Sequence, residues 1–297
     1  MVIGNGGSTI YSLASVFLDP KLASQYLLEK MVFYETLACP QCGETMQPNV
    51  ELWRFRCRAR TCRLDRSLYS HTFFFGTMLK SNEILFLGRL WLAKVPLTSA
   101  IELSGHSPNT VVKFWNHFRE LVSSTLAEED VVIGGENVIV EVDETKLGKR
   151  KYNRGHHVEG VWVVVGVERT EARKVFVIPV HTRDSDTLRS IITNHVRPGS
   201  IIHTDLWRGY SWLDNAAEYT HQTVNHSQGF INYETGVHTN FVEGTNAGIK
   251  RRIPVRSRVR EGIELHLGEF VWRRKNEGRD IWIAFVEALR EIHYVVE

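Results

Sequence analysis

Three acidic residues, Asp143, Asp205 and Glu243, stand in sequence surroundings that suit chemistry on phosphate esters. Asp143 closes the β-branched run Val138–Val142, and Asp205 follows the apolar run Ser200–His203, where a buried strand meets a loop. Glu243 lies in a stretch with helical periodicity. We therefore predict that two neighbouring strand ends and one covering helix bring the three carboxylates together.

The chemistry that these residue types support is metal-assisted phosphoryl transfer. Two Mg²⁺ or Mn²⁺ ions held by oxygen ligands, roughly 3.5–4 Å apart, can activate an attacking oxygen and stabilise a leaving oxygen. We expect Asp143, Asp205 and Glu243 to be catalytic and to bind two such ions, with Asn246 and Lys250 on the same helix face as Glu243. The alternative is that the aspartates are turn residues and the glutamate is one of many solvated helix residues.

All the cysteines of the chain, Cys39, Cys42, Cys57 and Cys62, form a C-x2-C pair, a gap of fourteen residues and a C-x4-C pair. Two close pairs of this kind can surround one tetrahedral Zn²⁺ with thiolates, and we predict one structural zinc ion. Four reduced cysteines packed as small hydrophobes, or a redox-active C-x-x-C, are the alternatives. The basic and aromatic segment 52–60 leaves DNA contact and a purely structural role equally open.

A second DNA-binding candidate follows the cysteines. Residues 98–103 have helical periodicity, Gly105 suits a turn, and Ser107 and Pro108 are typical of the N-cap and first position of a new helix. This pattern is typical of a helix-turn-helix, whose second helix would present three polar side chains to the major groove. These are Asn109, Thr110 and Lys113. A structural linker in a small helical bundle is the alternative.

The predicted elements indicate an α/β fold with four segments. Two short helices are expected before Phe33, broken at Asp19 and Pro20, and three helices over 81–126. Beyond residue 135, the order strand, strand, strand, helix, strand and further helices is that of an RNase H-like domain. We expect an N-terminal helical segment (1–36), a zinc-ribbon-like module (37–70), a helix-turn-helix-like module (71–130) and an RNase H-like catalytic domain with C-terminal helices (131–297).

Composition and charge limit the classes of protein to which the chain can belong, but they do not identify its function. An apolar fraction of 43% in 297 residues is ordinary for a folded protein that can bury more than one core. The sequence contains neither a bilayer-length apolar run nor a secretory leader, so we expect an intracellular protein with no membrane partner. A formal charge of +2 is compatible with an acidic metal site whose charge is offset by basic phosphate contacts.

Basic residues follow both the first aspartate and the glutamate, where contacts with DNA phosphates are expected. The first group is Lys149, Arg150, Lys151 and Arg154, and the second is Lys250, Arg251 and Arg252. A solvated loop or a nuclear-import signal is the alternative for either group.

Five stretches of the C-terminal half resemble the transposase domain of the Merlin superfamily and its bacterial insertion-sequence relatives of the ISXO2-like type. They are Val-Asp-Glu-Thr-Lys-Leu-Gly-Lys-Arg-Lys-Tyr-Asn-Arg-Gly from 142, Val-Glu-Gly-Val-Trp-Val from 158, Ile-Ile-His-Thr-Asp-Leu-Trp-Arg-Gly-Tyr from 201, Thr-Val-Asn-His-Ser from 223, and Glu-Thr-Gly-Val-His-Thr-Asn-Phe-Val-Glu-Gly from 234. The resemblance implies an RNase H-like fold, with the family's two aspartates on Asp143 and Asp205 and its glutamate on Glu243.

The resemblance also implies an activity. A cut-and-paste DNA transposase of this type binds terminal inverted repeats, cleaves the transposon ends and joins the 3′-hydroxyl to target DNA by two-metal phosphoryl transfer. Pairing of two ends implies at least a homodimer, for which the two C-terminal helices with apolar stripes are candidates. The run from Gly148 to Arg154 is closer to the eukaryotic branch and favours a nuclear location, whereas a bacterial protein would act at the nucleoid. A domesticated DNA-binding protein that does not cleave, or an RNase H-like nuclease, remains an alternative.

Overall fold

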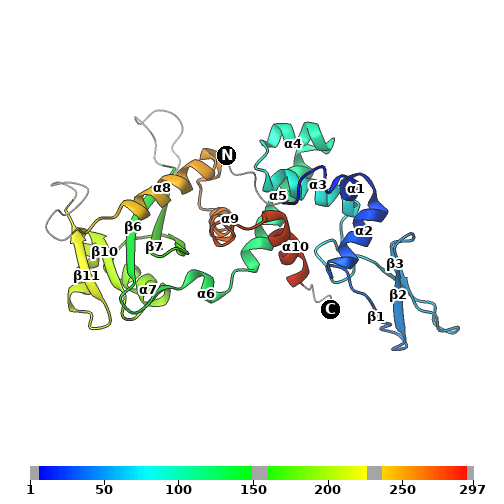
Figure 1. Cartoon of the computed structure of the whole chain (residues 1–297), viewed down its shortest axis with the longest axis horizontal. Coiled ribbons are helices and arrows are strands. Elements are labelled where there is room, and N and C mark those ends of the chain that lie inside the picture. The colour runs from blue at the N-terminus through cyan, green and yellow to red at the C-terminus, as the bar shows by residue number, and fades with distance from the viewer. Residues whose placement is uncertain (1–6, 149–159, 226–235, 293–297) are drawn as a thin grey trace. The chain divides into compact units, whose positions relative to one another are not determined.

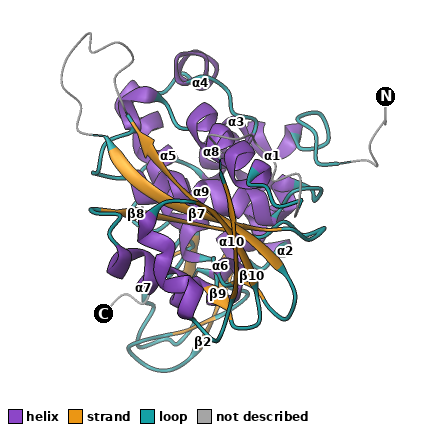
Figure 2. Ribbon diagram, turned by 90° about the vertical axis from the view of Figure 1, so that its left-hand side faces the viewer, coloured by secondary structure: helices purple, strands orange, loops and turns teal. Residues whose placement is uncertain are grey.

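The computed structural model describes residues 7–148, 160–225 and 236–292 as a mixture of helices and strands (Figure 2). The chain divides into two compact units: unit 1 comprises Met1–Thr125 and Asn276–Glu297, and unit 2 comprises Leu126–Lys275. No helix in the described ranges is both long and apolar enough to cross a lipid bilayer. The structure is therefore of the mixed α/β class that the sequence predicts.

Unit 1 consists of helices and one small sheet (Figure 1). Its helices are α1 (Ala14–Leu18), α2 (Pro20–Glu29), α3 (Ser81–Leu92), α4 (Leu97–Ser104), α5 (Pro108–Ser124) and α10 (Ile281–Glu291). Its antiparallel sheet has the order β1 (Leu37–Ala38), β2 (Thr45–Asn49), β3 (Arg54–Arg56) and β4 (Asp65–Ser67). The cysteines lie in and beside the loops of this sheet.

Local capping signals set the helix boundaries of unit 1 where the sequence predicts them. The Asp19 carboxylate accepts hydrogen bonds from the backbone of Lys21 and Leu22, so α2 begins directly at Pro20. The Ser107 hydroxyl caps α5 in the same way, and Gly105 ends α4 in the left-handed conformation at φ 69°. The two helices before Phe33 and the three helices over 81–126 are thus confirmed.

Helix α10 belongs to the core of unit 1. The Trp282 ring packs edge-on against Phe17 with centroids 5.5 Å apart, and Phe285 packs in the same manner against Phe118 at 5.4 Å. The sequence-based division places this helix in the domain 131–297, so the observed grouping differs from the expected one. The apolar stripe of a helix shows in the sequence, but the core that receives the stripe does not.

Unit 2 is built around a five-stranded sheet with the order β11 (Thr220–Val224), β10 (Ile201–Asp205), β6 (Ile139–Leu147), β7 (Val161–Glu168) and β8 (Val175–Val180). β6, β7 and β8 are antiparallel neighbours, whereas β10 and β11 run parallel to β6. The short strands β5 (Ile133–Gly134) and β9 (Val196–Arg197) form a second pair. The helical elements are α6 (Glu128–Val131), α7 (Ser185–His195), η1 (Arg208–Asn215), α8 (Asn240–Arg252), η2 (Val255–Ser257) and α9 (Ile263–Lys275).

Both faces of this sheet are covered, which explains why β7 and β8 are nearly continuous apolar runs. On one face, Val140, Val142 and Ile202 pack with residues of α7 and η1. On the other face, Leu147 and Val163 pack with residues of α8 and α9. Alternation along β6 therefore directs Glu141 and Asp143 to the α8 face.

The apolar stripes of the two C-terminal helices are buried within the chain itself. In α9, Leu267 and Val271 pack into the core below the sheet of unit 2, and in α10 Trp282, Phe285 and Leu289 lie in the core of unit 1. The prediction that these stripes form a dimer contact is therefore wrong, because folding of the single chain already removes them from water.

Candidate functional site

Asp143 and Asp205 lie on neighbouring parallel strands in matching register. The pairing of β10 with β6 joins Ile201 to Ile139 and His203 to Glu141, an offset of 62 residues (201 − 139). Asp205 and Asp143 are separated by the same offset (205 − 143 = 62), so continuing the register by two residues places them opposite each other. Both carboxylates are partly exposed. The sheet thus brings together two of the three predicted catalytic residues.

The position of Asp143 within its strand differs from the prediction. β6 does not end there, because it continues to Leu147 by pairing with β7, where Leu147 lies opposite Val161 and Asp143 opposite Val165. Asp205, by contrast, is the last residue of β10. The polar residues after Asp143 are typical of a loop, but hydrogen bonding to β7 keeps their backbone extended. Asp143 is therefore a mid-strand residue, and only Asp205 lies at a strand end.

Helix α8 crosses the sheet face that carries these aspartates (Figure 1). The Asn246 side-chain amide donates a hydrogen bond of 2.7 Å from Nδ2 to Oδ2 of Asp143. Glu243 lies one turn earlier in α8, where its Oε1 accepts a hydrogen bond of 3.1 Å from the Thr239 hydroxyl. Residues three apart share a helix face, so α8 presents Glu243 and Asn246 toward the same side.

A buried glutamate fixes the start of α8 on the sheet. Glu141 has no exposed surface, and its Oε2 accepts hydrogen bonds from the backbone N–H groups of Phe241 at 2.8 Å and Val242 at 3.0 Å. Its Oε1 pairs with Arg169 Nε at 2.5 Å, and Arg169 also donates to the His238 carbonyl. The negative carboxylate thus satisfies the free N–H groups at the positive end of the helix dipole. One side chain of β6 thereby sets where α8 begins.

Glu144 lies beside the aspartates on the opposite face of β6. Burial raises the pKa of Glu144 to about 7, and the charges of Asp143 and Asp205 act in the same direction. The Tyr210 hydroxyl and Arg183 oppose this rise in pKa, and the Arg183 guanidinium lies 3.8 Å from Glu144 Oε2. Glu144 therefore exchanges its proton near neutral pH.

Arg183 is held between two indole rings. Its guanidinium carbon lies 4.4 Å from the ring centroid of Trp162 and 4.4 Å from that of Trp207. The Trp207 backbone N–H donates to Asp205 Oδ1 at 2.9 Å. The loop after β10 therefore orients Asp205 and positions a fixed positive charge on the Glu144 side of the strands.

The carboxylate site suits a hard divalent cation by its donor chemistry. Asp143, Asp205 and Glu243 supply oxygen ligands of the kind that Mg²⁺ binds. The Asn246 side-chain oxygen is buried and has no hydrogen-bond partner among the described residues, although it belongs to the amide that contacts Asp143. The ligand oxygens of the three carboxylates do not all lie within 4.8 Å of one another. Asp143, Asp205 and Glu243 would hold the ions, and substrate phosphate would supply further oxygen ligands.

The four cysteines are gathered as a metal site requires. Their sulfur atoms all lie within 4.8 Å of one another, and this is the one such group of metal-ligating side chains in the described part of the chain. Cys39 and Cys62 sulfurs are 3.6 Å apart, and Cys42 and Cys57 sulfurs are 3.4 Å apart. A tetrahedral ion with Zn–S bonds of about 2.3 Å separates its sulfurs by about 3.8 Å. Gly43, at φ 74°, supplies the tight turn after the first pair.

The predicted DNA-contacting residues fall into three groups by their position and exposure in the structure. Asn109 and Lys113 are exposed on α5, where Thr110 is half-buried and hydrogen-bonded to the capping Ser107. The run 250–252 is exposed at the end of α8. Lys149, Arg150, Lys151 and Arg154 lie outside the described residues.

The His238 ring contacts Arg169 at 2.8 Å, and the Thr239 hydroxyl donates a hydrogen bond to Glu243. Sequence reasoning missed the roles of Glu141 and Arg169. The signal for Glu141 was present, because a charged residue inside an otherwise apolar strand must find a buried partner.

The fold and the site define a mixed α/β protein whose sheet and covering helix carry a set of acidic residues, joined to a second unit with a four-cysteine cluster. Residues 133–275 match the model of the ISXO2-like transposase domain. A transposase-like protein of Haemophilus influenzae is 36% identical over 108 residues, which are 35% of this chain and 82% of that protein. The chain belongs to the ISXO2-like transposase family.

The chain also has a distant similarity to a solved structure. The strand transfer complex of the Drosophila P element transposase aligns over 67% of this chain and 58% of that one, with 12% identity and a TM-score of 0.29. The chain thus spans 58% of the length of that protein. A similarity at this TM-score does not define a shared fold.

Proposed function

We propose that this chain is a cut-and-paste DNA transposase whose catalytic domain has the RNase H-like fold. Three antiparallel strands, a helix and then two strands parallel to the first are the order expected of that fold. The observation that carries the proposal is the matched register of Asp143 and Asp205 beneath α8, which bears Glu243 and Asn246. Membership of the ISXO2-like family supports the same activity.

The roles proposed for the side chains follow from their positions. Asp143 and Asp205 would hold divalent ions, and Glu243 would complete the ligand set from α8. Two bound Mg²⁺ or Mn²⁺ ions would supply activation of the attacking oxygen and stabilisation of the leaving oxygen. Asn246 keeps Asp143 oriented through its 2.7 Å hydrogen bond, and Glu141 keeps α8 in place.

The proposed substrate steps are those that the resemblance to transposases implies. Water attacks the phosphodiester at each transposon end, which releases a 3′-hydroxyl, and that hydroxyl then attacks a phosphodiester of target DNA. Each step breaks one phosphorus–oxygen bond and forms another, so no oxidant or reductant is required. Because two ends must be joined, we propose that at least two copies of the chain act together.

The N-terminal unit supports DNA binding in this proposal. The turn at Gly105 and the Ser107 cap present the exposed Asn109 and Lys113 on α5, as a recognition helix would. The cysteine cluster holds one zinc ion that fixes the short strands around it. The nuclear location stays a prediction.

A plasmid assay tests the activity. A plasmid carrying the two ends of the chain's own element, incubated with protein and Mg²⁺ or Mn²⁺, is expected to be cleaved and joined to a second plasmid. Asp143→Asn, Asp205→Asn and Glu243→Gln are each expected to abolish both steps while duplex binding is retained. Binding of end DNA without nicking or joining by the wild-type protein would favour a non-cleaving DNA-binding protein. Hydrolysis of the RNA strand of hybrids, with no strand transfer, would favour a nuclease.

A further inference from the structure

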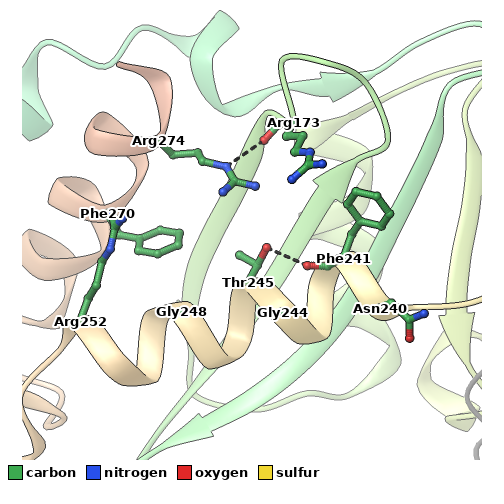
Figure 3. A pocket seen from close by; sticks show the side chains of 9 residues that line it. All are labelled: Arg173, Asn240, Phe241, Gly244, Thr245, Gly248, Arg252, Phe270 and Arg274. Atoms are coloured by element: carbon green, nitrogen blue, oxygen red, sulfur yellow. Dashed lines mark hydrogen bonds between the residues drawn. The ribbon is translucent and has the colours of Figure 1, made fainter. Parts of the chain in front are cut away.

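A groove lies alongside α8, between this helix, α9 and the turn that carries Arg173 (Figure 3). Its cavity volume is about 490 Å³, and α8, α9 and the turn between β7 and β8 line it. The α8 side chains in the groove include Asn240, Gly244, Gly248 and Arg252, which recur every four residues and so form one stripe along the helix. Glu243 and Asn246 lie on another side of α8, so this groove is separate from the carboxylate site.

The groove is strongly basic. Arg173, Arg252 and Arg274 line it from three different elements, and none of the residues that line it is acidic. The Arg173 guanidinium lies over the Phe241 ring at 5.1 Å, and that of Arg252 lies over the Phe270 ring at 5.3 Å. Stacking of this kind pre-orients a guanidinium and lowers the entropy that anion binding would cost.

Arg274, on α9, is held in place by a hydrogen bond. Its Nε donates a 3.4 Å hydrogen bond to the Arg173 carbonyl, so the two arginines converge at one end of the groove (Figure 3). Two guanidinium groups at one end of the groove repel each other, and such a pair is stabilised by an anion between them.

Two glycines line the groove on α8, although none of the residues that the structure describes requires a glycine there. A Cβ atom added at Gly244 would meet no atom within 4 Å, and one at Gly248 would meet only Phe270 at 3.9 Å. Both residues have ordinary helical backbone conformations, and each costs about 1 kcal/mol relative to alanine in a helix. Their effect is to bare the helix backbone between the arginines, which permits close approach of a bulky group from outside.

We propose that this groove binds the phosphodiester backbone of duplex DNA at a point away from the reacting phosphate. The three guanidiniums match the charge of one or two phosphates, and the bare surface at Gly244 and Gly248 accommodates the sugar–phosphate chain. Only Arg252 of this set is a DNA contact that the sequence predicts; Arg173 and Arg274 are new. The inference rests on the proposed function and adds to it a second contact with the same DNA, on the other side of α8.

The test introduces a charge into the groove without disturbing the fold. Gly244→Glu places a carboxylate between the arginines, and Gly244→Gln is its uncharged match; both residues favour a helix more than glycine does. Thr193→Glu, on the exposed side of α7, controls for the change in net charge. The affinity of the full chain for a fluorescent duplex of mixed sequence is measured by anisotropy over a series of KCl concentrations.

We expect Gly244→Glu to weaken duplex binding several-fold and to reduce the slope of log affinity against log salt by about 0.9 for each phosphate that the groove no longer binds. Gly244→Gln should bind more tightly than Gly244→Glu, and Thr193→Glu should match the wild type. The proposal is overturned if Gly244→Glu and Thr193→Glu have the same affinity and the same slope. It is also overturned if Gly244→Glu loses affinity for inorganic phosphate but keeps its affinity for duplex DNA.

The plasmid assay separates this inference from the proposed function. If the wild-type protein cleaves end DNA and Gly244→Glu binds duplex DNA with unaltered affinity, the proposed function is supported and DNA binding by the groove is overturned. If duplex binding depends on the groove but the wild-type protein neither nicks nor joins DNA, DNA binding by the groove is supported and the proposed function is overturned. A wild-type protein that binds no duplex contradicts both.

Discussion

Asn246 donates a hydrogen bond from its side-chain amide to the carboxylate of Asp143, over 2.7 Å and across 103 residues of sequence. Asn246 is buried on α8, and Asp143 is half-buried on β6. The bond therefore ties the covering helix to the sheet at the residue proposed to hold a metal ion. An acceptor bonded in this way presents its remaining lone pairs in a fixed direction.

Replacement of Asn246 by alanine is expected to reduce DNA cleavage by roughly 10- to 100-fold, the range found when a residue that orients a metal ligand is removed. Asn246→Asp is expected to be at least as harmful, because it places a second negative charge against Asp143. Cleavage rates as a function of Mg²⁺ concentration measure the effect. If alanine shifted neither the rate nor the Mg²⁺ dependence, the orienting role of Asn246 would be excluded.

Glu141 is expected to be indispensable for the placement of α8. Glu141→Gln leaves Arg169 without its charged partner and replaces a carboxylate at the helix start with a neutral amide, so we expect a loss of about 3–5 kcal/mol in the free energy of unfolding. Urea denaturation measures this loss.

A matched double variant separates the helix-capping role of Glu141 from its charge pairing. Glu141→Gln combined with Arg169→Met removes the uncompensated charge, so it should recover part of the stability without restoring cleavage. Full recovery of cleavage by the double variant would show that Glu141 serves only to neutralise Arg169.

Glu144 makes stability depend on pH. Its pKa is raised from the ordinary 4.5 to about 7 in the folded chain, mainly by burial. Between these values the folded state keeps a proton that the unfolded state loses, so this contribution to stability is full below pH 4.5 and is lost as the pH rises through 7. Glu144→Gln removes the ionisation, and its stability relative to the wild type should therefore increase with pH, by up to about 3 kcal/mol.

Thermal unfolding of both proteins at about pH 5 and about pH 8, with chelator present to remove divalent ions, measures this dependence. Asp186→Asn, at an exposed position on α7, provides a control with the same loss of one carboxylate. A constant difference in unfolding temperature between wild type and Glu144→Gln would contradict the raised pKa of Glu144.

Removal of zinc is expected to unfold the small sheet of unit 1. The segment around the cysteines has short strands and few buried side chains, among them Met46 and Phe55, so its stability should come largely from the metal. Elemental analysis of protein purified without chelator should return one zinc per chain. A strong chelator, or Cys57→Ser, should lower the melting temperature and expose the loop after β2 to protease. Protein without zinc and with unchanged protease resistance would show that the cysteines are packing residues.

The sequence by itself determined which elements form and which residue types can do the chemistry. The helix predicted between the third and fourth strands forms at residues 185–195, where an apolar stripe and the Asp184 cap are local signals. Asp19 and Ser107 mark helix starts for the same reason. The spacing of the four cysteines likewise predicts the cluster that the structure forms.

Only the tertiary structure decided how these elements meet. β6 continues past Asp143 because β7 pairs with it through Leu147, and α10 joins unit 1 because its apolar face fits the aromatic core there. The capping of α8 by Glu141 links positions 100 residues apart. Local periodicity determines whether a segment is a helix or a strand. The hydrophobic effect is non-directional, so it does not specify which segment of the chain covers a given apolar face. The partner of each buried face, and with it the geometry of the site, is therefore set by the folded chain as a whole.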